Sequence, residues 1–270
     1  IPLAGLGTRL LPLTSVFAKE LLPINGKPGL EYIIEECIEA GIKEIVFIIS
    51  KKKLMIKKYF YNDKFYKDII KKKNDPKIIK EYKKILKYKK MIKFVFQDKP
   101  LGTGDAVYKT KKFITDKYFL MLLPDDLIIK KNCSKSMIAV HNKFKASVMA
   151  SMKVNKNDVS RWGIYNIRKK IDKNNFIINN VVEKPSIKTS PSNNAVIGRY
   201  ILPKTIFSKL KSLKPGKSGE FHITDAIQAL IEDDNQFIGH NFSGKYLDCG
   251  TMKGYIKSTL EISKQWNFAW

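Results

Sequence analysis

A short apolar segment followed by a glycine-rich turn limits the fold of this chain more than any other feature. The turn reads Ala4-Gly5-Leu6-Gly7-Thr8-Arg9, and Lys19-Glu20 follows soon after it. Two glycines separated by one residue let the backbone turn tightly and approach a ligand that a Cβ would exclude. Their N–H groups form an electropositive nest that suits phosphate. Because Arg9 adds a planar fork for phosphate oxygens and Lys19 a mobile positive charge, we predict an anion-binding loop here.

Two better-known phosphate-binding motifs do not fit the chain. A dinucleotide-binding G-x-G-x-x-G motif requires glycine where the chain has Leu10. A Walker loop fails at Gly216-Lys217-Ser218, because Lys211 stands where its first glycine is required. For the two glycines alone, the alternative is an ordinary tight turn that binds nothing. The basic residues beside them favour anion binding.

The order of the expected elements predicts one α/β domain over residues 1–270. Residues 28–40 have the apolar spacing of a helix, and 44–50 form a short apolar run typical of a buried strand. A strand, loop, helix and strand in this order form a βαβ unit and indicate a parallel sheet. We therefore predict a Rossmann-like, three-layer α/β/α fold with a mixed, mostly parallel central sheet. Further strands are expected at 91–97, 117–123, 146–154, 163–167, 176–183, 195–202, 236–242 and 246–248, and further helices at 204–213, 223–232 and 251–264.

The segment 117–123 is continuously apolar, which is typical of a strand at the centre of a sheet. Residues 51–90 are different, since they are rich in Lys and Tyr and carry Ile and Leu at helical spacing. Asp75-Pro76 divides this segment into two helical pieces. We predict an inserted amphipathic helical hairpin with a solvated, charged face.

The charge of the chain is strongly positive, with 51 Lys and Arg against 25 Asp and Glu and a formal net charge of +26. Such a charge is found in nucleic-acid-binding proteins. Here, however, the lysines are scattered through every segment and accompany many Ile and Asn, which indicates a codon bias toward A and T. We therefore expect no nucleic-acid partner, although the charge attracts anionic substrates in general.

Three widely spaced cysteines, Cys37, Cys133 and Cys249, predict no disulfide framework and fit a reducing cytoplasm. No apolar run approaches the ~20 residues of a membrane span, so no membrane partner is expected. A strand usually has ~5–6 residues, whereas only three precede Ala4. We therefore expect the natural chain to begin with further residues.

Polar residues follow several of the predicted strands. Asp125 and Asp126 follow one and Asp248 another, and carboxylates are the hard oxygen ligands that Mg²⁺ takes together with substrate phosphates. The alternative is that they cap turns. Gln97 precedes a second glycine-rich turn, and its amide matches the N3–H and O4 edge of uracil or thymine, unless it is simply solvated. Lys184 can neutralise a phosphate; the alternative is a surface ion pair with its neighbour Glu183.

Taken together, these motifs resemble those of the sugar-phosphate nucleotidylyltransferases. Over nearly its whole length the chain resembles the bacterial UTP–glucose-1-phosphate uridylyltransferases among them. The resemblance is carried by residues 4–9, 19–23, 97–104, 123–126, 162–165, 183–185, 198–200, 219–227 and 247–250. The Lys-rich hairpin occupies the place of a helical insertion in that family, and related thymidylyltransferases are shorter there.

The resemblance implies a reaction of UTP with α-D-glucose 1-phosphate that gives UDP-glucose and pyrophosphate. It implies nucleotide contacts at Ala4, Gly5, Gly7, Thr8, Gln97 and Gly102, of which Ala4, Gly5, Gln97 and Gly102 hold the uracil. It implies catalytic cations at Arg9, Lys19 and Lys184, with Arg9 and Lys19 on the triphosphate. It also implies sugar-phosphate contacts at Gly163, Glu183 and Lys184, and Mg²⁺ at Asp125 and Asp248.

The chain departs from the family pattern at three positions. It has Ala18 where the family usually has proline, Thr103 where it usually has leucine, and Asp105 where it usually has histidine. Asp105 adds a negative charge near the expected nucleotide site and leaves the choice of base open. The alternatives are a glucose-1-phosphate thymidylyltransferase, a catalytically silent protein that binds sugar nucleotides, and a basic nucleic-acid binder. Oligomeric state is open as well, with a homo-oligomer as one expectation.

Overall fold

The computed structural model describes residues 1–216 and 219–264, which contain nine α-helices, six short 3-10 helices and twelve strands. Lys217 and Ser218, from the rejected Walker motif, lie outside them. The helices are α1 Gly29–Glu39, α2 Leu54–Tyr61, α3 Asp63–Lys73, α4 Pro76–Met91, α5 Gly102–Tyr108, α6 Cys133–Phe144, α7 Ile206–Ser212, α8 Ile223–Glu232 and α9 Met252–Ser263. The strands are β1 Pro23–Ile24, β2 Lys27–Pro28, β3 Ile45–Ile49, β4 Ile92–Phe96, β5 Tyr118–Leu122, β6 Asp126–Ile129, β7 Ser147–Lys153, β8 Gly163–Lys170, β9 Asn175–Glu183, β10 Asn194–Pro203, β11 Phe237–Asn241 and β12 Lys245–Asp248.

The largest sheet has six strands in the order β5-β10-β7-β11-β9-β8. A further pairing of Ala195 with Ile164 joins β10 to β8 and curls the sheet back on itself. The prediction of a mixed sheet is confirmed. The prediction that parallel pairs predominate is wrong, because in this sheet only β11 and β7 run parallel among the described strands. Short connections such as that between β8 and β9 allow antiparallel pairing, whereas parallel strands need a long crossover.

The position of β5 also differs from the prediction. Its apolar sequence indicated a central strand, yet it lies at one end of the strand order and pairs only with β10 among the described residues. Apolar side chains are needed there nevertheless, since Met121 and Leu122 are buried in two different hydrophobic clusters. Burial on both faces, rather than a central position, explains the apolar run.

The first half of the chain does contain the predicted parallel βαβ unit. β3 and β4 pair in parallel, and Pro2 forms a parallel bridge with Ile48 on the other side of β3. Helix α1 begins after Pro28 and ends before Gly41, whose φ of 83° is the left-handed conformation expected after a helix. The carboxyl ends of the N-terminal segment, β3 and β4 therefore lie at one edge.

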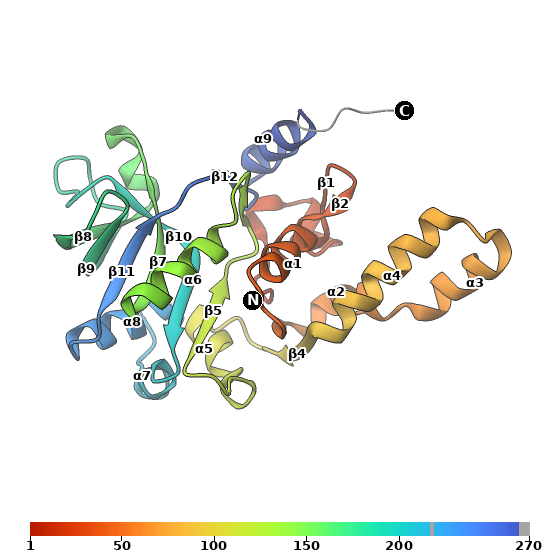
Figure 1. Ribbon diagram of the computed structural model, residues 1–270, viewed down its shortest axis with the longest axis horizontal. Helices are drawn as coiled ribbons and strands as arrows, with labels where there is room; N and C mark the ends of the chain where they lie inside the picture. Colours follow the sequence, from red (N-terminus) through yellow and green to blue (C-terminus); the bar gives the residue numbers. More distant parts are fainter. Residues whose placement is uncertain (217–218, 265–270) are drawn as a thin grey trace.

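Helices pack on both faces of the six-stranded sheet, because the side chains of its strands alternate. In β7, Val148 packs in a cluster with Met137 of α6, whereas Met149 packs with Phe207 of α7 and Ile227 of α8. Figure 1 shows this arrangement, with the α3–α4 pair projecting on the side away from β8 and β9. No helix in the described part of the chain is both long and apolar enough to span a membrane.

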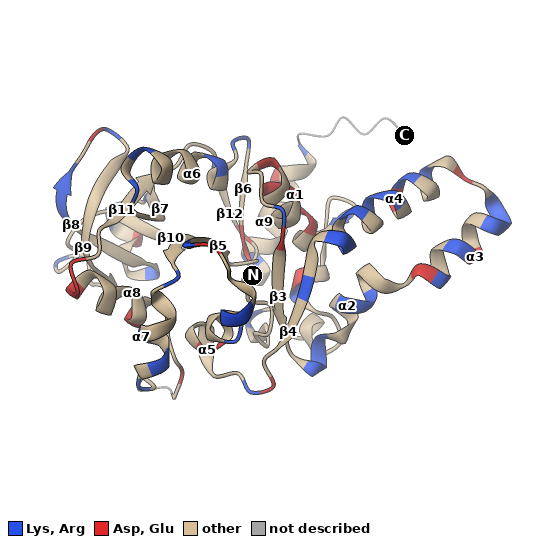
Figure 2. Cartoon of the chain, turned by 60° about the horizontal axis from the view of Figure 1, so that its bottom comes forward, with Lys and Arg blue, Asp and Glu red and all other residues tan. Residues whose placement is uncertain are grey.

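The Lys-rich insertion folds into three helices, so the prediction of two pieces is wrong. The predicted turn is present: Asp75 caps α4 by accepting a hydrogen bond from the Lys77 N–H at 2.7 Å. A second break occurs at Asn62, whose φ of −90° and ψ of 51° are not helical. The break separates α2, which is anchored in the core through Phe60, from α3, which has no buried residue. Figure 2 shows Lys and Arg on α2, α3 and α4 but also on α6, α7 and β8.

The two phenylalanines of this insertion provide a matched test of how it is held. Phe60 is completely buried and packs on Phe47, with ring centroids 5.9 Å apart, whereas Phe65 is 54% exposed. We expect Phe60→Ala to lower the free energy of unfolding by about 3–5 kcal/mol. Phe65→Ala should change it by no more than about 0.5 kcal/mol. Urea unfolding followed by circular dichroism measures both, and equal losses would show that α2 is not the anchor.

Candidate active site

The glycine-rich turn has the conformation expected of a ligand-binding loop. Gly7 has a φ of 71°, and a Cβ there would also lie 3.1 Å from the Thr14 methyl group, so only glycine fits without strain. The Thr14 hydroxyl donates to the Gly7 carbonyl oxygen at 2.8 Å and holds the turn. At Gly5, by contrast, no atom lies within 4 Å of an added Cβ. The following turn buries Leu10 and leaves Thr8 and Arg9 exposed, so this loop presents polar groups to solvent.

A buried ion pair between Lys53 and Glu20 packs under the glycine-rich turn, on its side toward the protein core. The Lys53 ammonium donates to the Leu3 carbonyl oxygen at 2.7 Å and to both carboxylate oxygens of Glu20 at 2.8 Å. Burial lowers the pKa of Lys53 and raises the pKa of Glu20, and the attraction between the two opposes both shifts. Sequence reasoning missed Lys53, since nothing distinguishes it from the neighbouring lysines 51 and 52.

Asp125 lies where the predicted cations meet. Its Oδ2 atom is 2.8 Å from the Lys19 ammonium and 3.3 Å from Nη2 of Arg9. Burial opposes ionisation of Asp125, but these two cations outweigh it and lower the pKa of this carboxyl. The structure thus brings together residues 9, 19 and 125, which the sequence placed at one site.

Asp248 approaches the same point from β12. A Cβ added to Gly250 would lie 2.7 Å from Oδ2 of Asp125, 3.3 Å from Oδ1 of Asp248 and 2.9 Å from Nη2 of Arg9. The Cys249 N–H donates to the Asp125 carbonyl oxygen at 2.8 Å and fixes the two segments against each other. The absent side chain of Gly250 therefore leaves a space that two carboxylates border.

This space fits a Mg²⁺ ion by the chemistry of its donors. Mg²⁺ usually takes one or two protein carboxylates and completes its octahedron with water and substrate phosphates. Within residues 1–216 and 219–264, no three or more His, Cys, Asp or Glu side chains cluster as a ready-made metal site. Asp125 and Asp248 are therefore the residues that could hold such an ion, with phosphate oxygens as the remaining ligands.

Asp126 has a different environment from its neighbour. Its Oδ1 accepts a hydrogen bond from the Tyr246 hydroxyl at 2.7 Å, and its Oδ2 accepts one from the Gly198 N–H at 2.8 Å. Burial and the charge of Asp125 raise the pKa of Asp126. Gly198 must lack a side chain, because a Cβ would lie 2.5 Å from this carboxylate. Asp126 therefore supports the loop, whereas Asp125 faces the cations.

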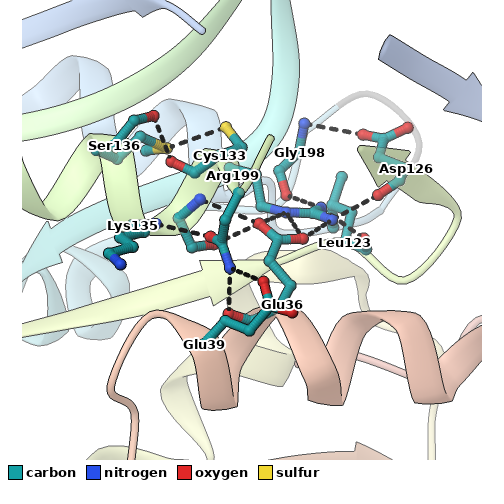
Figure 3. Close-up of polar contacts among 12 residues, drawn as sticks. Glu36, Glu39, Leu123, Asp126, Cys133, Lys135, Ser136, Gly198 and Arg199 are labelled. Carbon is teal, nitrogen blue, oxygen red and sulfur yellow. Dashed lines mark hydrogen bonds and ion pairs between the residues drawn. The ribbon is translucent and has the colours of Figure 1, made fainter. Parts of the chain in front are cut away.

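A buried arginine clamps the loop that carries both aspartates (Figure 3). Arg199 has no exposed surface and forms an ion pair with Glu36, with Nη2 at 2.8 Å from Oε2. Its other N–H groups donate to the carbonyl oxygens of Leu123 at 3.0 Å and Asp126 at 2.6 Å. Sequence reasoning assigned no role to Arg199 or Glu36. One signal was available, since Arg199 is a charged residue in an otherwise apolar predicted strand.

Gln97 and Gly102 also lie together, as the sequence predicted. Nε2 of Gln97 donates to the Gly102 carbonyl oxygen at 3.0 Å and to Oδ2 of Asp105 at 2.8 Å. Gly102 has a φ of 93°, and a Cβ there would lie 2.6 Å from the Phe221 carbonyl oxygen. The close approach that requires glycine at this position is therefore to the chain itself.

Gly163, Glu183 and Lys184 form a second cluster. Gly163 pairs with Glu183 across β8 and β9, and a Cβ on Gly163 would lie 3.0 Å from Oε2 of Glu183. The Lys184 ammonium is exposed and lies 3.8 Å from Oε1 of Glu183. The Lys184 N–H donates to the Trp162 carbonyl oxygen at 3.0 Å.

The two clusters are not joined in the way the sequence predicted. A mostly parallel sheet would bring both clusters to one edge at the carboxyl ends of its strands, but β9 is antiparallel to its neighbours. Instead the bridge between β8 and β10 brings the start of β8 toward Gly198 and Asp126. Trp162 completes the link, since its ring centroid is 5.5 Å from that of Tyr246, the donor to Asp126.

A cavity of about 680 Å³ opens elsewhere, between β3 and β5. Its lining is largely apolar and includes Ile45, Val107 and Leu120. None of the residues predicted to bind substrate lines this cavity. The charged groups that could bind phosphate therefore lie outside this cavity, around Gly250, along the glycine-rich turn and at Lys184.

Known proteins resemble this chain over almost its whole length. A family model described as "Nucleotidyl transferase" matches residues 3–265. The chain is 35% identical to a "Putative UTP--glucose-1-phosphate uridylyltransferase" of Methanocaldococcus jannaschii over 98% of this chain and 92% of the relative. A crystal structure of UDP-glucose pyrophosphorylase complexed with UDP-glucose aligns with a TM-score of 0.85 at 33% identity, over 98% of this chain and 97% of that one. A UTP-bound UGPase from Acinetobacter baumannii aligns with a TM-score of 0.89 at 30% identity, over 99% and 93%.

The clamp on the aspartate loop can be tested with two matched substitutions. Glu36→Gln leaves the buried Arg199 without its counter-charge, so we expect the free energy of unfolding to fall by about 3–5 kcal/mol. Glu44→Gln removes the partner of Lys93, a pair of similar length at 2.9 Å but with both side chains largely exposed. It should cost no more than about 1 kcal/mol. Urea unfolding measures both variants, and a small effect of Glu36→Gln would contradict the clamp.

Proposed function

The chain belongs to the nucleotidyl transferase family, and on this premise we propose that it catalyses the reaction of UTP with α-D-glucose 1-phosphate to give UDP-glucose and pyrophosphate. One observation above all supports the proposal: the glycine-rich turn, two cations and two carboxylates from distant segments converge around Gly250. Such an arrangement suits two phosphorylated substrates and a metal ion. The names of the relatives supply the base and the sugar.

The reaction is an in-line displacement at phosphorus. An anionic phosphate oxygen of the sugar phosphate attacks the α-phosphorus of UTP and forms the new P–O bond, while the bond to the β-phosphate oxygen breaks and pyrophosphate leaves. No general base is needed, because the attacking oxygen already carries a charge. The main task of the protein is to position the two anions and to neutralise the charge between them.

The residues of the turn hold the nucleotide. Backbone N–H groups of Ala4, Gly5, Gly7 and Thr8 face the ligand. Arg9 and Lys19 hold the triphosphate, and in the absence of ligand their charges are balanced by Asp125. Gln97 and Gly102 hold the uracil together with Ala4 and Gly5. Because Arg9 is 64% exposed and Lys19 only 15%, Arg9 is the side chain with more freedom to follow the phosphates.

Asp125 and Asp248 would hold Mg²⁺. When it is bound, Mg²⁺ supplies positive charge beside the phosphate oxygens. The sugar phosphate lies against the second cluster: Glu183 accepts hydrogen bonds from sugar hydroxyls, Gly163 leaves space beside it, and Lys184 neutralises the phosphate. The exposed Lys184 ammonium supports this role, since its only partner among the described residues is the weak contact with Glu183.

We place the chain in the Rossmann-like, three-layer α/β/α architecture, as one domain over residues 1–270 with an insertion at 51–90. The helices on both faces of the six-stranded sheet support this assignment. Three separate, buried thiols support a cytoplasmic location.

A panel of substrates tests the proposed reaction. Pyrophosphate release should be fastest with UTP and glucose 1-phosphate. UTP should exceed ATP and GTP by at least ~10²-fold in kcat/KM, because a purine leaves polar groups of a pyrimidine pocket unpaired. The panel needs four nucleoside triphosphates, each assayed with several sugar 1-phosphates. Equal turnover with ATP, or no pyrophosphate from any pair, would contradict the proposal.

The two carboxylates are tested by substitution. Asp125→Asn and Asp248→Asn keep the shape but remove a charge at the metal, so each should nearly abolish turnover. The double variant should be little worse than either single one, since residues that act as a unit are not additive. Asp116→Asn, at an exposed position, is the matched control.

Calorimetry of Mg²⁺ binding provides a second readout for these variants. UTP should strengthen Mg²⁺ binding to the unmodified protein and to Asp116→Asn, because phosphate oxygens complete the coordination. The enhancement should be lost in Asp125→Asn and Asp248→Asn. Normal turnover in either of these two variants would exclude that residue as a ligand.

A further inference from the structure

The side chain of Gln97 is held in one place at the carboxyl end of β4. It is only 4% exposed, and its backbone N–H donates to the Ile49 carbonyl oxygen at 2.9 Å. A glutamine amide has one end with two hydrogen-bond donors and another end that only accepts. Which end faces a ligand is therefore decided by the groups around the amide.

Both donors of this amide are already engaged by the protein. Nε2 donates to the Gly102 carbonyl oxygen at 3.0 Å and to Oδ2 of Asp105 at 2.8 Å. A carbonyl oxygen and an ionised carboxylate can only accept. Turning the amide around would place its oxygen against two acceptors and break both hydrogen bonds. The amide is thus fixed in one of its two orientations.

The carbonyl oxygen of the same amide has no such partner. Oε1 of Gln97 accepts no hydrogen bond from residues 1–216 or 219–264, and it is not among their buried polar atoms that lack a partner. It still reaches solvent. The side chain therefore offers an acceptor, and no free donor, to a ligand beside Gly102.

Asp105 is itself held from two sides. Its other oxygen, Oδ1, lies 3.5 Å from the ammonium of Lys109, one turn further along α5. The start of α5 is fixed because the Gly104 N–H donates to the Phe221 carbonyl oxygen at 2.7 Å. The carboxylate of Asp105, whose charge left the choice of base open in the sequence, therefore contacts Gln97 and Lys109.

We propose that Asp105 is a positioning residue for base selection: by fixing the Gln97 amide it presents an acceptor, which selects a pyrimidine with an N3–H donor. Uracil and thymine have this donor, whereas N3 of cytosine is an acceptor and would face the Gln97 oxygen. This inference rests on the proposed function, because it assumes that the nucleotide lies beside Gln97. Cytosine is the informative competitor, since it matches uracil in size.

Discrimination between UTP and CTP tests the inference. The unmodified protein should prefer UTP strongly in kcat/KM. Asp105→Ala removes one of the two acceptors and frees the amide to turn, so the UTP-to-CTP ratio should fall at least tenfold, mainly through KM. Asp105→Asn keeps an oxygen that can accept from Nε2, so it should retain most of the ratio. Asp116→Ala, the same truncation at an exposed aspartate, should leave the ratio unchanged.

The ratio separates positioning from a purely structural role. If Asp105 only stabilises α5, Asp105→Ala will lower kcat/KM for both nucleotides alike, and an unchanged ratio overturns the inference. Calorimetric binding of UMP and CMP gives the same comparison without turnover. If the unmodified protein prefers UMP and Asp105→Ala does not, the inference stands even where no pyrophosphate is released and the proposed reaction fails.

Discussion

The buried guanidinium of Arg199 is the interaction on which the rest of this structure depends. Removing such a charge from water costs several kcal/mol, and the cost is offset only if every N–H group finds a partner. Arg199 finds them in the Glu36 carboxylate and in the carbonyl oxygens of Leu123, Gly198 and Asp126. The guanidinium of Arg199, on strand β10, therefore holds helix α1 and the loop after β5 in place through hydrogen bonds. None of them can shift without leaving a buried charge or carbonyl unpaired.

This clamp explains how two adjacent aspartates acquire different properties. With the loop fixed, Asp126 points inward to Tyr246 and Gly198, where burial and the neighbouring charge raise its pKa. Asp125 points to Lys19 and Arg9, which outweigh burial and lower its pKa. Identical side chains thus serve as a structural hydrogen-bond acceptor and as an ionised group at the site. The difference comes from backbone direction, which the clamp sets.

Local rules predicted the features that depend on neighbouring residues. The turn at Gly7 and the break at Asp75-Pro76 follow from the conformational preferences of glycine and proline. The site residues around Asp125 were predicted together because several motifs end predicted strands. The strand order of the second half was not predictable in this way, since an apolar strand buried on both faces occurs at the end of a sheet as well as at its centre.

Long-range polar pairs were beyond prediction for a related reason. Lys53 contacts Glu20 across 33 residues of sequence, and Arg199 contacts Glu36 across 163. Among the many lysines of this chain, one that is buried has the same local sequence signature as one that is solvated. A buried pair is recognisable only when both partners are placed, and this requires the fold. Local sequence likewise does not distinguish Asp125 from Asp126, and only the resemblance to a known family selected Asp125.

The balance of charge at the site differs from that of the whole chain. Around Gly250 two cations, Arg9 and Lys19, face two carboxylates, Asp125 and Asp248, and beneath them Lys53 and Glu20 form a pair of their own. The formal net charge of the chain is nevertheless +26. Attraction of anionic substrates is therefore a property of the surface as a whole. Asp125 neutralises Arg9 and Lys19 in the absence of ligand, and under the proposed function a phosphate oxygen would replace it as the partner of these cations.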